Sequence, residues 1–142
     1  MVTDITNGIA VTLHKAFGDK YTIYTEDIEQ GLKEPCFFIA VLNPEQRQFI
    51  GNRYQQDIPF DVHYFPKGKA KNADIQEVAA TLYAELRQIQ LLNGDLLNGV
   101  RLHHETVDGV LHFFVQYKPI IKYPVDPVEI MGGIKIENKT KD

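Results

Sequence analysis

Two stretches of the chain carry apolar residues at the spacing of an amphipathic helix. In the first, apolar residues recur at steps of four and share one helical face: Ile5, Ile9, Leu13 and Phe17. In the second, they recur at steps of three and four: Ile75, Val78, Ala79, Leu82, Leu86 and Ile89. This periodicity predicts two helices that each bury one face. Thr3 and Asn72 are suited to cap these helices, and Gly18–Asp19 is suited to end the first.

The segments between the helices have the patterns of strands. Cys36–Leu42 is a run of seven apolar residues between proline-containing turns, which is typical of a strand buried on both faces. Residues 46–53 form a more polar strand, and Ile58–Tyr64 alternates between apolar and polar positions. Pro59 lacks the N–H that a strand ladder needs, so it indicates an edge or the start of a strand.

The pattern after the second helix predicts strands at Leu96–Leu97, Val100–Thr106 and Val110–Tyr117. Asp108–Gly109 joins the last two, since a two-residue type I′ hairpin needs positive φ at both positions. The expected order is α-β-β-β-α-β-β-β, with a short additional strand over Tyr21–Thr25. The sequence therefore predicts an α+β fold in which two helices pack on one face of a mostly antiparallel sheet.

The composition changes after Lys118, where prolines and a Gly132–Gly133 pair follow one another closely. We expect residues 1–118 to form one α+β domain and residues 119–142 to form an extended C-terminal arm without a core of its own. The arm is nevertheless richer in apolar residues than a solvated linker. These are candidates for an interface with a neighbouring subunit: Val128, Ile130, Met131, Ile134 and Ile136.

Charge and composition limit the partners of the chain. The formal net charge is −4 and the isoelectric point is near 5.7, which argues against generic binding of duplex nucleic acid. Lys67, Lys69 and Lys71 form a basic loop without a phosphate-binding glycine pattern. A solvated loop is the simplest interpretation, and in an assembly these lysines could face a lumen or an acidic neighbour.

The single cysteine, Cys36, excludes an intrachain disulfide, and its apolar surroundings predict a buried, inert thiol. The N-terminal residues lack a basic segment followed by an apolar one, so no signal peptide is expected. No stretch approaches the ~20 apolar residues of a membrane span. The expectation is a protein that is made and assembled in the host cytoplasm.

The sequence offers little for catalysis. It contains no serine, which removes serine hydrolases. Across the Asp108–Gly109 hairpin, paired residue numbers sum to 217, so Glu105 faces His112, while His103 and His104 point to opposite faces. Such a pair gives two metal ligands where zinc usually takes three or four, so a cross-strand polar pair is favoured. We expect no catalytic residue, no metal and no cofactor; a small metal-binding enzyme that uses the histidines is the less favoured alternative.

Four strand and turn segments carry a resemblance to a known family. They are IYTEDIEQGLKEPCFFI (residues 23–39), LNPEQ (42–46), VHYFP (62–66) and VDGVLHFFVQY (107–117). Together they resemble phage tail terminator proteins over roughly residues 3–118. The shared segments are structural, and none is a catalytic motif.

This resemblance implies a structural role. The family is expected to form a homohexameric ring that caps the head-proximal end of the tail tube, stops tube polymerisation and offers a surface for head–tail joining. The implied partners are other copies of the chain, the tail tube protein, and sheath and neck or head-completion proteins, with DNA passing through the lumen. A different head–tail connector or neck protein is the alternative. Phage tails and tail-like bacteriocins would both use such a terminator protein.

Overall fold

The computed structural model describes residues 1–25, 31–68 and 72–125. The chain divides into two compact units. The first, which we call the core unit, comprises Met1–Glu45 and Asp57–Lys118. The second, which we call the ribbon unit, comprises Gln46–Gln56 and Pro119–Asp142. One long strand, β4 (Arg53–Phe65), contributes residues to both units.

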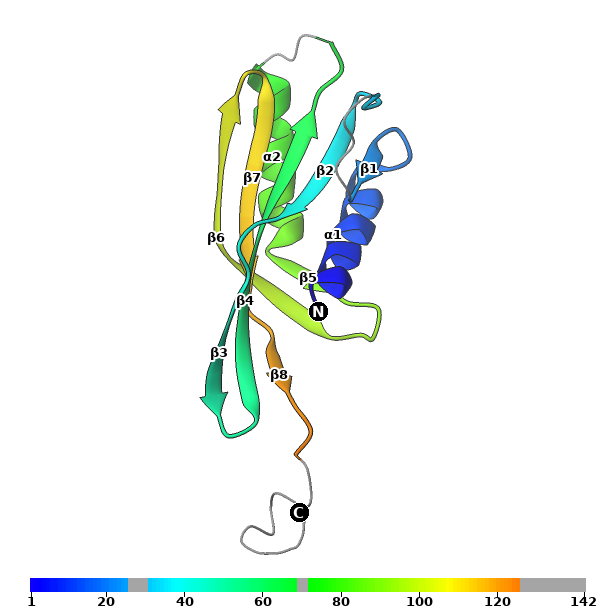
Figure 1. Ribbon diagram of the computed structural model, residues 1–142. Helices are drawn as coiled ribbons and strands as arrows, with labels where there is room; N and C mark the ends of the chain where they lie inside the picture. Colours follow the sequence, from blue (N-terminus) through cyan, green and yellow to red (C-terminus); the bar gives the residue numbers. More distant parts are fainter. Residues whose placement is uncertain (26–30, 69–71, 126–142) are drawn as a thin grey trace, which may run out of the picture. The chain divides into compact units, whose positions relative to one another are not determined.

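The core unit contains both helices and most of the sheet (Figure 1). Besides β4, its elements are α1 (Val2–Phe17), β1 (Thr22–Tyr24), β2 (Cys36–Val41), α2 (Asn72–Leu86), β5 (Gln88–Gln90), β6 (Leu96–Val107) and β7 (Val110–Tyr117). The strands lie in the order β1-β2-β4-β7-β6-β5, and all neighbours are antiparallel except the β1–β2 pair. The predicted α+β class with a mostly antiparallel sheet is confirmed, although more strands flank α2 than the expected order contains.

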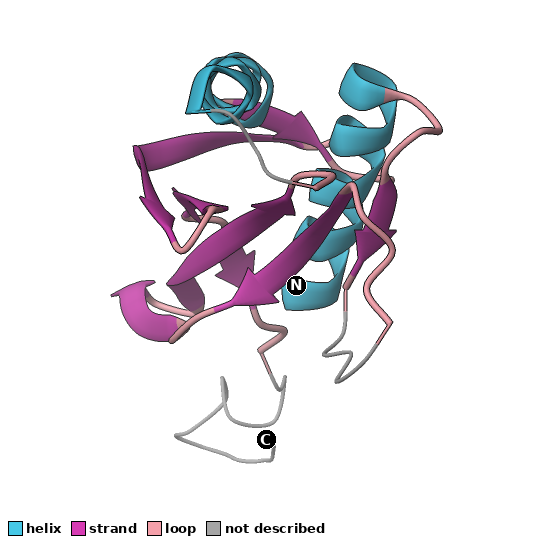
Figure 2. Cartoon of the chain, turned by 90° about the horizontal axis from the view of Figure 1, so that it is seen from above, coloured by secondary structure: helices cyan, strands magenta, loops and turns pink. Residues whose placement is uncertain are grey.

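Both helices pack on one face of this sheet, which Figure 2 shows from above. Alternation along the strands places every second side chain beneath the helices. In β4 and β7 these are Ile58, Phe60, Val62, Tyr64, Leu111, Phe113, Val115 and Tyr117. The helices contribute the predicted stripes, with Ile5, Ile9, Leu13, Leu82 and Leu86 fully buried. The opposite face of the sheet carries the polar and aromatic residues that alternate with these.

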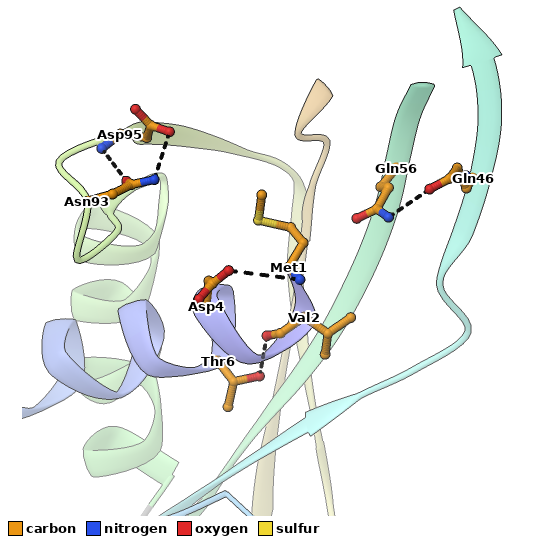
Figure 3. Close-up of polar contacts among 8 residues, drawn as sticks. All are labelled: Met1, Val2, Asp4, Thr6, Gln46, Gln56, Asn93 and Asp95. Carbon is orange, nitrogen blue, oxygen red and sulfur yellow. Dashed lines mark hydrogen bonds and ion pairs between the residues drawn. The ribbon is translucent and has the colours of Figure 1, made fainter. Parts of the chain in front are cut away.

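The predicted Thr3 cap is wrong. Helix α1 begins at Val2, Met1 is its N-cap, and no side chain caps it. The backbone already closes the first turn, since Ile5 N–H donates to Met1 O at 3.0 Å. Figure 3 shows that Asp4 instead approaches the terminal amine of Met1, at 3.9 Å. The favourable charge at this helix end is the carboxylate of Asp4, which lies in the first turn, where the helix dipole stabilises negative charge.

Helix α2 ends earlier than its apolar stripe predicts. It stops at Leu86, and Ile89 is buried on strand β5 instead of on the helix. Strand β5 pairs with β6. Gly99 of β6 allows the backbone of Leu86 to come close, because a Cβ at position 99 would lie only 2.7 Å from the Leu86 carbonyl oxygen. A buried strand residue three positions past the helix satisfies the helical spacing, which is why periodicity alone could not separate the two elements.

The turns and the register that the sequence predicts are confirmed. Asp108 and Gly109 have φ of 51° and 77°, as a type I′ hairpin requires. Glu105 pairs with His112 across this hairpin, as the sum rule predicts. The two predicted strands before it are one strand, β6, with a bulge between Val100 and His103.

Pro59 lies inside β4 and not at its start, which corrects the sequence interpretation. Its carbonyl accepts a hydrogen bond from Leu42 N at 2.9 Å, one residue beyond the end of β2. In an antiparallel sheet, the N–H and C=O of one residue point to the same neighbouring strand. The side of Pro59 without an N–H donor therefore faces the end of β2, where the ladder stops and no donor is needed. The other side of β4 continues with Pro59 opposite Gln116 of β7.

Replacing Leu82 by Ala should lower the free energy of unfolding by about 2–5 kcal/mol, because this fully buried side chain would leave a cavity between α2 and the sheet. Urea unfolding followed by circular dichroism measures the change. The exposed Glu77→Ala change on the same helix is the control and should stay within about 0.5 kcal/mol. A loss below about 1 kcal/mol for Leu82→Ala would mean that the cavity closes by repacking.

Cys36 is buried, as predicted, and burial raises the pKa of its thiol, with the nearby Glu34 carboxylate adding to the effect. Such a thiol is a poor nucleophile at neutral pH. Among the described residues, neither helix combines the length and apolar character needed to cross a lipid bilayer.

Candidate functional site

The ribbon unit is the most unusual part of the surface. Strand β3 (Glu45–Ile50) and the start of β4 are joined by the two residues Gly51–Asn52, so they run antiparallel. Strand β8 (Ile120–Lys122) pairs with β4 at Arg53–Gln55. Within the described residues, β3 and β8 each pair with β4 alone. Each therefore presents a strand edge whose backbone donors and acceptors remain available to another chain.

Every residue of β3 is exposed, including two large apolar ones. Phe49 is 53% exposed and Ile50 is 66% exposed, and Ile120, Tyr123 and Val125 are also exposed. Of the twelve large apolar side chains that are exposed in the described parts of the chain, five thus belong to this small unit. Apolar side chains concentrated on an open ribbon mark an interaction surface and are not required by the core.

Polar side chains hold the ribbon together across its strands. Arg47 donates to Gln55, and Gln56 donates to Gln46 at 2.8 Å (Figure 3). The side-chain amide of Asn52 donates a hydrogen bond to the backbone carbonyl of Tyr123. The rings of Tyr54 and Tyr123 pack edge to face, with their centroids 5.3 Å apart. These contacts fix the strand register and leave the apolar side chains free to meet a partner.

A shallow hollow lies beside this tyrosine pair and within the ribbon unit. It is lined by Gln46, Gly51, Asn52, Tyr54, Tyr123, Pro124 and Val125. Aromatic and amide groups line it together, and none of these described lining residues carries a carboxylate, imidazole or amine. Its surface is suited to receiving a side chain of a partner protein more than to performing chemistry.

The interface candidates from the sequence fall in three places. Lys67 is exposed at the start of the loop after β4. Lys69 and Lys71 lie outside the described residues, as do the arm candidates Val128, Ile130, Met131, Ile134 and Ile136. Near Lys67, a second hollow is lined by Glu34, Phe65, Pro66, Gly68, Asp108, Gly109 and Val110. The sequence interpretation did not include Phe49 and Ile50 among the interface candidates, although both are apolar residues in an otherwise polar strand.

The three histidines that the sequence singled out do not form one cluster. His104 lies on the helix side, where it is hydrogen-bonded to Tyr83 Oη at 2.7 Å and to Gln76 Oε1 at 3.1 Å. His103 lies on the other face and stacks on Phe114, with ring centroids 4.7 Å apart. His112 shares that face and contacts Asp61. The predicted alternation of His103 and His104 is confirmed, and it separates them.

The described surfaces therefore offer strand edges and exposed apolar side chains for contacts with other chains. The chain matches the family described as phage tail terminator protein over residues 4–128. No curated protein matches it significantly. Because the match covers most of the chain, the protein belongs to the phage tail terminator family. It is a component of the virion tail and associates with other tail proteins, and its family is structural.

Proposed function

We propose that this protein forms a homohexameric ring at the head-proximal end of the tail tube, stops tube polymerisation there and provides the surface for head–tail joining. The observation that supports the proposal most strongly is the ribbon unit, with its two strand edges and exposed apolar side chains, in a chain of the tail terminator family. The proposed partners are other copies of this chain, the tail tube protein, and sheath and neck or head-completion proteins.

The ribbon supplies a physical route to a ring. A neighbouring subunit that covers Phe49 and Ile50 would remove apolar surface from water, at about 25 cal/mol per Å². An open edge such as that of β3 can also add a strand from the neighbour. When one surface of each subunit binds a different surface of the next and the rotation closes, the product is a ring and not a filament.

In a closed ring, every ribbon is already engaged with a neighbour, so the number of copies is fixed. Tube growth would stop because this ring occupies the end of the tube and offers no surface for a further ring of tube protein. One rim of the ring would bind the last ring of tube protein, and the other rim would meet the neck or head-completion proteins. DNA would pass through the lumen without being read, consistent with the net charge of −4.

The C-terminal arm is proposed to complete this interface. Its apolar residues, Val128 to Ile136, come a few residues after β8, which ends at Lys122. Ordering a segment costs roughly 1–2 kcal/mol per residue, so an arm without its own core requires contacts from elsewhere. We propose that the arm orders against a neighbouring subunit or the tube. The domain boundary at residue 118 remains a prediction.

The basic loop has a separate proposed role. Lys67, together with Lys69 and Lys71, would face an acidic neighbour or the lumen, where complementary charge steers the partners together. None of these contacts involves chemistry, so we propose that the protein is not an enzyme. It would be made and assembled in the host cytoplasm before it enters the virion.

Removing the protein from tail assembly should test the proposal. Tails assembled in a host that carries the other tail genes but lacks this reading frame should be longer than normal and variable in length, because nothing closes the tube. Supplying the protein in trans should restore a single length. Electron microscopy of negatively stained particles measures the lengths. Tails of normal, uniform length without the protein would contradict a terminating role.

A further inference from the structure

Strands β4 and β7 bring two histidines and an aspartate together on the face of the sheet opposite the helices. Asp61 and His63 alternate with the core residues of β4, so both point to this face. His63 pairs directly with His112 of β7 in the strand register. Three side chains from two neighbouring strands therefore converge, with their positions fixed by backbone pairing.

The ligand atoms of these side chains are already close to a coordination geometry. Asp61 Oδ2 lies 2.9 Å from His63 Nε2 and 3.1 Å from His112 Nδ1. All three side chains offer a ligand atom within 4.8 Å of the other two. Zinc bonds nitrogen and oxygen at about 2.0–2.2 Å, so two ligands on a tetrahedral ion lie roughly 3.3 Å apart. Rotations of the side chains by a small amount would satisfy that spacing.

The buried carboxylate of Asp61 favours binding of a cation by this cluster. Its side chain is only 10% exposed, and its Oδ1 is buried without a hydrogen-bond partner. Aromatic rings flank the cluster. The ring centroids of Phe38 and Phe65 lie 5.6 Å and 6.1 Å from that of His63. A buried carboxylate in such surroundings requires a compensating positive charge. The two imidazoles remain about a quarter exposed, so an ion can reach them from solvent.

We propose that Asp61, His63 and His112 bind a late first-row divalent cation of the Zn²⁺ class. Imidazole nitrogen and carboxylate oxygen are ligands that Zn²⁺ prefers, and three protein ligands leave a fourth position for water or a partner group. The ion joins β4 to β7 and has a structural role. Its site lies within the core unit, so it is independent of the assembly proposed above.

A matched pair elsewhere in the core unit serves as the control. His14 Nε2 contacts Asp19 Oδ1, but both side chains are largely exposed and supply only two ligands. Water screens the charges of an exposed pair of this kind, and two ligands make an incomplete site. His14→Gln removes one histidine and one histidine–aspartate contact, as His112→Gln does, without touching the proposed cluster.

Isothermal titration of ZnCl₂ into chelator-treated, full-length protein with its purification tag removed tests the proposal. The expected result is about one ion per chain, with affinity at least about tenfold weaker in His63→Gln and in His112→Gln. His14→Gln should bind like the parent, and Zn²⁺ should raise the melting temperature of the parent and of His14→Gln only. Circular dichroism confirms that each variant is folded before titration.

Two outcomes would overturn the assignment. One is an absence of stoichiometric binding to the parent protein, which would mean that the cluster is only a polar contact between β4 and β7. The other is parent-like binding in folded His63→Gln and His112→Gln, which would place the ion elsewhere.

Discussion

Replacing Phe49 and Ile50 together by aspartate should leave the core unit folded and abolish ring assembly. Both side chains are exposed in the single chain, at 53% and 66%, so no buried contact of the core is lost. In a subunit interface they would be covered, and each new carboxylate would then cost several kcal/mol to remove from water. Native mass spectrometry of the protein mixed with tube ends measures the ring.

The matched control places the same two charges on exposed apolar residues of the core unit. Leu92 and Leu96 are 85% and 60% exposed near the β5–β6 turn. The double change of these two leucines to aspartate should leave assembly intact. If the control blocks assembly as strongly as the ribbon variant, the ribbon is not the specific contact. If rings form normally with both ribbon residues charged, the ribbon has no role in closure.

Truncation after Val125 should give a folded protein that fails to form stable rings. All residues of the buried core cluster lie between Ile5 and Tyr117, so the core unit keeps its packing. The truncation retains β8 and removes the apolar arm residues, which we propose order against a neighbour. Thermal unfolding measures the fold, and native mass spectrometry measures the ring. We expect the melting temperature to change by only a few degrees.

A second truncation, after Lys118, separates the arm from β8. It removes the strand that pairs with Arg53–Gln55 and should be at least as defective in assembly. If the chain ending at Val125 still forms rings and caps tails of normal length, the arm is dispensable. A defect seen only after removal of β8 would assign the interface to the ribbon alone.

Local patterns in the sequence predicted the local parts of the fold. The apolar stripes located both helices, and Asp108–Gly109 located the hairpin and set the Glu105–His112 register correctly. These features depend on residues close together in the chain, where spacing determines geometry. The error at Ile89 has the same origin, because a short strand continued the helical spacing by coincidence.

The features that the sequence did not predict depend on pairing between strands that are distant in the chain. Asp61 meets His112 because β4 pairs with β7, and no local pattern specifies that two distant strands are neighbours. The ribbon unit depends on β8 returning to Arg53–Gln55, which is equally remote in sequence. Phe49 and Ile50 were visible as apolar residues in a polar strand, but the sequence pattern did not show that both side chains are exposed.

The central claim is tested most directly by locating the protein in assembled tails. Cryo-electron microscopy of intact tails should show the α+β core unit as a single ring of six copies at the head-proximal end, beyond the last ring of tube protein. Copies distributed along the tube, or a ring only at the distal end, would contradict the account.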